Sequence, residues 1–259
     1  MGRFHRHDDG TVHTHDHDEH GHEHHDHGDH SGYETGSQRI DVLESIFAEN
    51  DVRADYNRKA FESNGIRALN LMSSPGSGKT TVLGATLDEL AGEFAVGVIE
   101  GDIATDLDAA KLGGRGAQIS LLNTGNGFGG ECHLDAPMVN RALQGLELPQ
   151  LDLVIIENVG NLVCPAEFDV GEHAKAMVYS VTEGDDKPLK YPVMFRAVDV
   201  VLLNKIDLVP YLDVDVDSYT ARVREVNPTA TILPISARTG AGMSAWFGWL
   251  RRFMAAAAT

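Results

Sequence analysis

The segment at residues 73–81 constrains this chain more than any other. Its sequence, Ser-Ser-Pro-Gly-Ser-Gly-Lys-Thr-Thr, follows the GxxxxGK[ST] pattern of phosphate-binding loops, with Ser73 in place of the first glycine. An apolar run from Ile66 to Met72 precedes it and a helical pattern follows, so the segment joins a strand to a helix. Such a loop presents backbone N–H groups and a helix N-terminus to a phosphate. The residues expected to surround that phosphate are Gly76, Ser77 and Gly78.

Three side chains at the end of this loop carry chemistry. Lys79 can place a full positive charge on the outer phosphates, which makes it a candidate catalytic residue. The hydroxyl of Thr80 can take one coordination position on Mg²⁺, and Thr81 completes the nucleotide-binding segment. A Gly-Lys-Thr triplet can also arise by chance in a glycine-rich turn, but its place between a strand and a helix disfavours that alternative.

A second motif, Asn204-Lys205-Ile206-Asp207, follows a later apolar run. The Asp207 carboxylate can accept hydrogen bonds from N1–H and the 2-amino group of guanine, which adenine does not present. Ser236-Ala237-Arg238 follows the next strand and joins the same predicted site. Together with the phosphate loop, the motif predicts that the nucleotide is GTP or GDP.

Two acidic segments, Glu100-Gly101-Asp102 and Glu157-Asn158-Val159-Gly160, also end apolar runs. Ligands of parallel sheets bind beyond the carboxyl ends of the strands. Asp102 is therefore a candidate catalytic residue that positions Mg²⁺ or the attacking water, and Glu157 could hold Mg²⁺ through its waters. The N–H of Gly160 could contact the γ-phosphate. The alternative for each acid is a solvated side chain after a strand.

Strand and helix patterns alternate over most of the chain and predict an α/β protein, with a mostly parallel central sheet flanked by helices in the P-loop NTPase fold. The expected strands are Ile66–Met72, Phe94–Glu100, Leu151–Glu157, Val198–Asn204 and Thr231–Ser236. Residues 37–64 form a helical segment that Ser37 can cap, that Gly65 can close, and that Asn50-Asp51 could divide in two. Residues 65–259 form the nucleotide domain.

Residues 1–36 differ sharply from the rest. The first 30 residues hold eight acidic side chains and almost nothing apolar, so we expect this tail to be disordered. Closely spaced neutral imidazoles predict a flexible chelator of Ni²⁺ or Zn²⁺, and the alternative is a solvated acidic spacer. The tail histidines are His5, His7, His13, His15, His17, His20, His22, His24, His25, His27 and His30.

Composition excludes several classes. The 259 residues carry a formal charge of −18, which argues against a nucleic-acid surface. Two cysteines argue against a disulfide scaffold and fit a reducing cytosol. No apolar stretch reaches the roughly 18 residues of a membrane span, and the polar N-terminus does not resemble a signal peptide. The sequence therefore predicts a cytoplasmic protein that binds neither nucleic acid nor membrane.

Residues 38–259 resemble the HypB family, the SIMIBI-class P-loop GTPases that help insert nickel into hydrogenase. The segments that carry the resemblance are SSPGSGKTT at 73–81, EGDIATDLDA at 100–109, ECHLDAP at 131–137, ENVGNLVCP at 157–165, NKIDLVPY at 204–211 and SARTGAGM at 236–243. Urease nickel GTPases are an alternative, but they carry Cys-Pro-His where this chain has Cys164-Pro165-Ala166. Some family members also begin with a cysteine-containing nickel site, and here no cysteine precedes Cys132.

The resemblance implies slow GTP hydrolysis coupled to nickel insertion during [NiFe]-hydrogenase maturation. The implied partners are hydrogenase maturation proteins, the hydrogenase large subunit and a second copy of the chain in a GTP-promoted homodimer. The alternative in another class is a nickel-storage protein whose GTPase domain is regulatory.

The resemblance also implies a metal site at Cys132, His133 and Cys164, which the residue types support. Thiolate and imidazole suit Ni²⁺ and Zn²⁺. Neighbours in a strand point to opposite faces, so Cys132 and His133 reach one ion only through a turn or across a subunit boundary. Three ligands per chain favour a symmetric homodimer that shares the metal. The alternatives are small core cysteines with a loop histidine, or an intrachain disulfide.

Overall fold

The structure is a computed structural model that describes residues 5–6, 12–13, 35–102, 112–123, 133–161 and 164–256. The chain divides into two compact units, residues 1–42 and 43–259. In the first unit β1 (His5–Arg6) pairs with β2 (Val12–His13) in a short antiparallel ladder. Most of the tail that we expect to be disordered, with the other nine tail histidines, lies outside the described residues.

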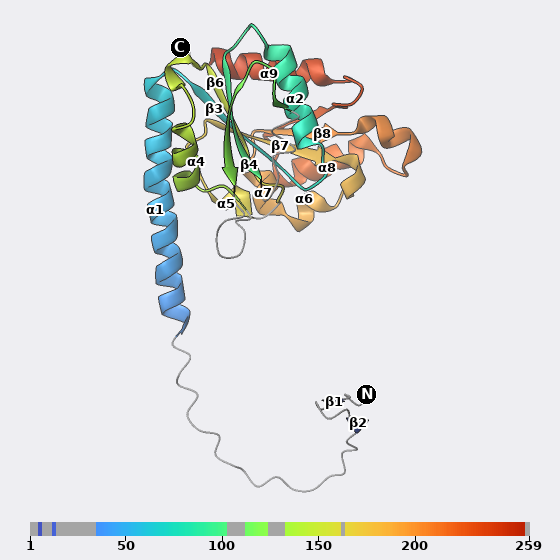
Figure 1. Ribbon diagram of the computed structural model, residues 1–259. Coiled ribbons are helices and arrows are strands. Elements are labelled where there is room, and N and C mark those ends of the chain that lie inside the picture. Colours follow the sequence, from blue (N-terminus) through green and yellow to red (C-terminus); the bar gives the residue numbers. More distant parts are fainter. Residues whose placement is uncertain are drawn as a thin grey trace, which may run out of the picture. The chain divides into compact units, whose positions relative to one another are not determined.

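The second unit is built on a sheet of seven parallel strands in the order β5-β4-β6-β3-β7-β8-β9 (Figure 1). The strands are β3 (Arg67–Ser73), β4 (Val96–Asp102), β5 (Gln118–Asn123), β6 (Leu153–Glu157), β7 (Ala174–Ser180), β8 (Val200–Asn204) and β9 (Thr231–Pro234). The parallel α/β architecture expected from the sequence is confirmed. The strand nearest the centre, β3, leads directly into the phosphate loop.

Helices cover both faces of this sheet. The longer helices are α1 (Thr35–Ser63), α2 (Lys79–Leu90), α4 (Ala136–Leu143), α8 (Val216–Val226) and α9 (Met243–Ala255). The short helices are α5 (Cys164–Glu167), α6 (Lys187–Lys190) and α7 (Pro192–Arg196). Single 3₁₀ segments are η2 (Leu148–Gln150), η3 (Val181–Glu183) and η4 (Ile206–Tyr211).

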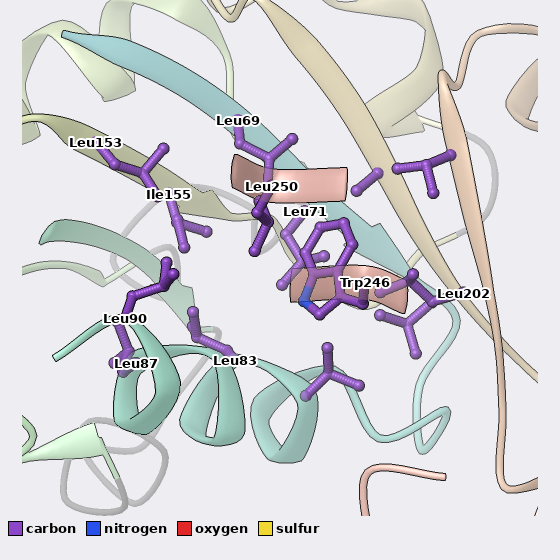
Figure 2. Close-up of a cluster of buried hydrophobic side chains, with 14 of the residues drawn as sticks. Leu69, Leu71, Leu83, Leu87, Leu90, Leu153, Ile155, Leu202, Trp246 and Leu250 are labelled. Atoms are coloured by element: carbon purple, nitrogen blue, oxygen red, sulfur yellow. The ribbon is translucent and has the colours of Figure 1, made fainter. Parts of the chain in front are cut away.

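The two faces bury separate apolar clusters, because side chains alternate along β3. Leu69 and Leu71 pack on one face with α2 and α9, and Figure 2 shows them beside Leu83 and Trp246. The indole N–H of Trp246 donates to the buried hydroxyl of Thr86 at 2.9 Å, which joins α9 to α2. On the other face α1 and α4 cover β4 and β6, while α7 and α8 cover β7 and β8.

The structure corrects three local expectations. The helix begins at Thr35 rather than after a cap at Ser37, and it does not divide at Asn50. Asn50 is buried, and its side chain forms hydrogen bonds with the backbone of Asp169 and Ala136 instead of breaking the helix. The expected closing glycine is not among the corrections, because Gly65 follows the helix at φ 71°. Two strands were missed in the sequence, β5 and β7.

Candidate functional site

The loop between β3 and α2 lines a pocket of about 420 Å³ at the carboxyl ends of the central strands. The loop turns through Gly76 at φ 74° and Gly78 at φ 100°, a region in which other residues are strained. Gly78 is also the N-cap of α2, so Lys79 opens the helix. The predicted residues that line the pocket are Gly76, Ser77, Gly78, Lys79, Thr80, Thr81, Glu157 and Gly160.

Glu157, the last residue of β6, holds two side chains of this loop. Its Oε1 accepts hydrogen bonds from Lys79 Nζ at 2.6 Å and Thr80 Oγ1 at 3.0 Å. Glu157 is 1% exposed, and its Oε2 is buried without a hydrogen-bond partner in the described part of the chain. A carboxylate oxygen left free beside a threonine hydroxyl fits Mg²⁺, which prefers oxygen ligands. The geometry of these oxygens therefore suits Mg²⁺ beside the phosphate loop.

The neighbouring strand ends meet at the same pocket. Asp102 ends β4, which pairs with β6, but its side chain lies outside what the structure describes. Glu100, which belongs to the first acidic segment but for which no role was predicted, lies in register with Glu157 and lines the pocket. A Cβ added to Gly160 would fall 3.3 Å from Pro75 Cα, so the backbone there comes close to the phosphate loop.

The second motif forms an adjoining pocket of about 290 Å³. The hydroxyl of Ser236 donates to Asp207 Oδ1 at 2.6 Å, which orients the carboxylate. Two residues, Gly78 and Thr81, line both this pocket and the phosphate pocket. The predicted residues that line it are Asn204, Lys205, Asp207, Ala237 and Arg238.

Side chains of the second motif are hydrogen-bonded to the phosphate loop. Asn204 Nδ2 donates to the carbonyl of Ser77 at 2.9 Å, and its Oδ1 accepts from the N–H of Ala237 at 3.1 Å. Lys205 Nζ donates to the carbonyl of Gly76 at 2.6 Å. Lys205 has φ 65° and is the only non-glycine residue at positive φ in the described ranges. Strain of this kind, about 1–3 kcal/mol, persists where the surroundings hold it, and here both loops do.

A further carboxylate supports the phosphate loop and was missed in the sequence. The hydroxyl of Ser74 donates to Glu183, and Glu183 also accepts from the N–H of Ser180 at 2.9 Å. The Ser180–Glu183 pair forms a capping box at the end of β7. A serine followed three residues later by glutamate is the signal that could have revealed it.

The candidate metal residues are only partly described. His133 stacks on Phe168, with ring centroids 4.1 Å apart, and Phe168 lies 5.2 Å from Phe47 of α1. Phe168 follows α5, the helix that Cys164 begins, so the stack places His133 beside the segment that contains Cys164. Cys132 and the side chain of Cys164 lie outside the described residues. Within the ranges that the structure does describe, no three His, Cys, Asp or Glu side chains are grouped to hold a metal ion.

Helix α1 holds the backbone on both sides of this motif through buried amides. Asn57 Nδ2 donates to the carbonyls of Ala136 at 2.9 Å and Val170 at 3.0 Å. Arg58 pairs with Asp169 at 2.6 Å. Burial alone would raise the pKa of Asp169, but the N–H of Gly171 and the Arg58 guanidinium hold it below its usual value. This carboxylate is therefore ionised beside Arg58 of α1.

Comparison with known proteins decides the family. A family model described as the CobW/HypB/UreG nucleotide-binding domain matches residues 67–234. The hydrogenase maturation factor HypB of Azotobacter chroococcum mcd 1 is 50% identical over 216 residues, which cover 83% of this chain and 70% of that protein. The chain belongs to the HypB family. The HypB protein of Escherichia coli (strain K12) is 48% identical over 223 residues, 86% of this chain and 76% of that protein.

Solved HypB structures share the architecture. HypB from Archaeoglobus fulgidus superposes with a TM-score of 0.74 at 37% identity and covers 80% of this chain and 99% of its own. HypB from Helicobacter pylori, solved in complex with nickel, gives a TM-score of 0.74 at 36% identity and covers 80% and 95%. The P-loop fold is confirmed, and the family model makes residues 67–234, which include the phosphate loop, a nucleotide-binding domain. No helix in the described part of the chain is long and apolar enough to cross a membrane.

Proposed function

We propose that the chain hydrolyses GTP and couples the cycle to nickel insertion during [NiFe]-hydrogenase maturation. One observation carries the nucleotide assignment: the phosphate pocket and the Asp207 pocket are neighbours, and Gly78 and Thr81 line both. A phosphate cradle therefore adjoins a carboxylate that can accept two hydrogen bonds from guanine. The proposed maturation role is that of the HypB relatives, which are hydrogenase maturation factors. The proposed metal is nickel because HypB from Helicobacter pylori was solved in complex with nickel.

The chain's own groups have distinct roles in this proposal. The N–H groups of Gly76 to Gly78 and the ammonium of Lys79 bind the β- and γ-phosphates. Thr80, Glu157 and Asp102 would hold Mg²⁺, which neutralises phosphate charge when it is bound. Lys79 leaves Glu157 for phosphate oxygens on nucleotide binding, and Asp102 is proposed to orient water. The N–H of Gly160 is proposed to contact the γ-phosphate. Ser236, Ala237 and Arg238 complete the guanine end.

Cys132, His133 and Cys164 are the proposed Ni²⁺ or Zn²⁺ ligands, shared across a homodimer. The stacking of His133 on Phe168 supports a common site for His133 and Cys164, because it brings the imidazole beside the segment that Cys164 begins. The tail histidines are proposed as a separate, flexible store of Ni²⁺. The hydrogenase maturation proteins and the large subunit are the proposed protein partners.

A competition titration tests the nucleotide assignment. A fluorescent GDP bound with Mg²⁺ should be displaced by GTP and GDP and not by ATP, since Asp207 has no partner on adenine. Phosphate release should be slow, about 10⁻⁴ to 10⁻² s⁻¹, as for intrinsic GTPases of this kind. Equal competition by ATP would reject the guanine assignment.

A further inference from the structure

Leu134, the residue after His133, lies between two strand ends of the nucleotide site. Its backbone N–H donates to Oδ1 of Asn158 at 3.0 Å. Its side chain covers Gly101 of β4, because a Cβ added to Gly101 would fall 2.7 Å from Leu134 Cδ2. Both Leu134 and Asn158 are 0% exposed. A residue adjacent to the candidate metal motif is therefore packed directly against the nucleotide-binding strands.

Asn158 is firmly held and follows the carboxylate that binds the phosphate loop. Its N–H donates to the carbonyl of Leu71 at 3.0 Å, and its Oδ1 also accepts from the N–H of Val159 at 2.9 Å. The preceding residue, Glu157, accepts hydrogen bonds from both Lys79 and Thr80. In the proposed function a Mg²⁺-nucleotide takes over Lys79 and Thr80, so Glu157 exchanges these partners when the nucleotide binds.

We propose that the bound nucleotide sets the metal affinity of the Cys132–His133 segment through the buried side chain of Leu134, which we call the wedge. Asn158 is its positioning residue. The proposal rests on the proposed function. A change at Glu157 reaches Asn158 through one peptide bond and reaches Leu134 through the buried hydrogen bond. Because packed interiors shift between discrete arrangements, a small movement of Leu134 displaces its neighbour His133. The contact is a contiguous chain of packed and hydrogen-bonded groups through which coupling between the two sites can be carried.

Asn57 offers a matched control for Asn158. It is also a buried asparagine, and its amide holds the same segment through the carbonyl of Ala136. It lies on α1, however, and does not line the phosphate pocket or the guanine pocket. Its loss should weaken the metal segment equally in every nucleotide state, whereas loss of Asn158 should remove the difference between states.

The test is a Ni²⁺ titration of the full chain, saturated with GDP or with a non-hydrolysable GTP analogue. Thiolate-to-nickel charge-transfer absorption reports only on Cys132 and Cys164, the two cysteines of the chain, so the tail does not contribute to the signal. The wild-type ratio of the two affinities should be about 5- to 150-fold. Asn158→Ala and Leu134→Ala should bring it within about twofold of one, and Asn57→Ala should leave it unchanged.

Leu134→Ala keeps every side-chain hydrogen bond, so it serves as the second variant if Asn158→Ala does not fold. A wild-type ratio well above one that survives in a folded Leu134→Ala or Asn158→Ala variant overturns the wedge and leaves the proposed function intact. An equal loss of the ratio in Asn57→Ala also overturns it. A wild-type ratio of one rejects the proposed coupling of nucleotide to metal, and the wedge with it.

Discussion

Replacing Gly78 with alanine should separate the two halves of the nucleotide site. A Cβ at this position would fall 2.5 Å from Nδ2 of Asn204, closer than any two such atoms approach. Asn204 must then move, and it loses its bonds to the carbonyl of Ser77 and the N–H of Ala237. The Gly78→Ala variant should therefore bind GDP more weakly even though no atom that contacts the nucleotide is removed.

The size of the loss follows from those two bonds. Each hydrogen bond contributes about 0.5–1.5 kcal/mol net, so the pair amounts to about 1–3 kcal/mol. At 1.4 kcal/mol per factor of ten, GDP affinity should fall roughly 5- to 150-fold. The left-handed backbone adds a separate cost of about 1–2 kcal/mol to folding. Gly76→Ala shares that cost, because its φ is also positive, but its Cβ would meet nothing within 4 Å.

A double-mutant cycle measures the contact directly. GDP affinity is determined by titration with a fluorescent analogue for wild type, Gly78→Ala, Asn204→Ala and the double variant. If displacement of Asn204 causes the loss, Gly78→Ala should cost almost nothing further in the Asn204→Ala background. Denaturant unfolding of Gly78→Ala and Gly76→Ala provides the control for backbone strain. Full additivity of the two losses would refute the reasoning.

Four further outcomes are expected. Asp207→Asn should weaken GTP at least about tenfold, since a hydrogen bond to a charged group contributes about 1.5–3 kcal/mol, and should favour xanthine nucleotides in the same competition titration; unchanged guanine preference contradicts the role of the carboxylate. Lys79→Ala should abolish phosphate release, and retained turnover would remove it from the catalytic residues. Deletion of residues 1–36 should remove several bound Ni²⁺ per chain, measured by metal analysis, and leave GTP turnover nearly unchanged. Ni²⁺ binding by the wild-type chain should weaken below about pH 6.5, because the imidazoles become protonated. An unchanged number of bound Ni²⁺ after the deletion would favour the interpretation of the tail as a solvated acidic spacer. Burial and then the charge of Arg67 lower the pKa of His173, whose Nδ1 accepts from the N–H of Ala68 at 2.9 Å. The stability that comes from neutral His173 is complete above about pH 6.5 and is lost as the pH falls. The variant His173→Asn keeps a hydrogen-bond acceptor and should reduce the slope of the unfolding free energy against pH. An unaltered slope would contradict the lowered pKa of His173.

The sequence predicted strands where burial on both faces imposes a continuous apolar run. Every residue of Leu153–Glu157 is buried, and this strand was found. Strand β7 was missed although it is central, because Lys175 interrupts its apolar pattern; its ammonium lies 3.2 Å from Glu172, three residues earlier. Strand β5 was missed because it lies at the edge of the sheet and leaves Leu121 49% exposed.

The nucleotide residues were predictable because their chemistry is local: short motifs at strand ends meet at one edge of a parallel sheet. Asn158 was not singled out, since Leu134 is 24 residues away in sequence. The capping box of Glu183 with Ser180 is local, but its contact with Ser74 spans 109 residues. The interruption expected at Asn50 was wrong for the same reason, because the structure uses the polar side chain for tertiary contacts. Local patterns thus locate ligand-binding groups better than the residues that connect them.

The placement of the tryptophans gives the protein an internal optical reporter. Both Trp246 and Trp249, the two in the chain, lie on α9 and stack with ring centroids 5.4 Å apart. Trp246 is bonded to Thr86 of α2, the helix that Lys79 opens. Its intrinsic emission and the near-ultraviolet dichroism of the stacked pair therefore follow how α2 rests on the sheet. A movement of α2 on nucleotide binding can therefore be followed in time by stopped-flow fluorescence of the unlabelled protein, without a dye on the nucleotide.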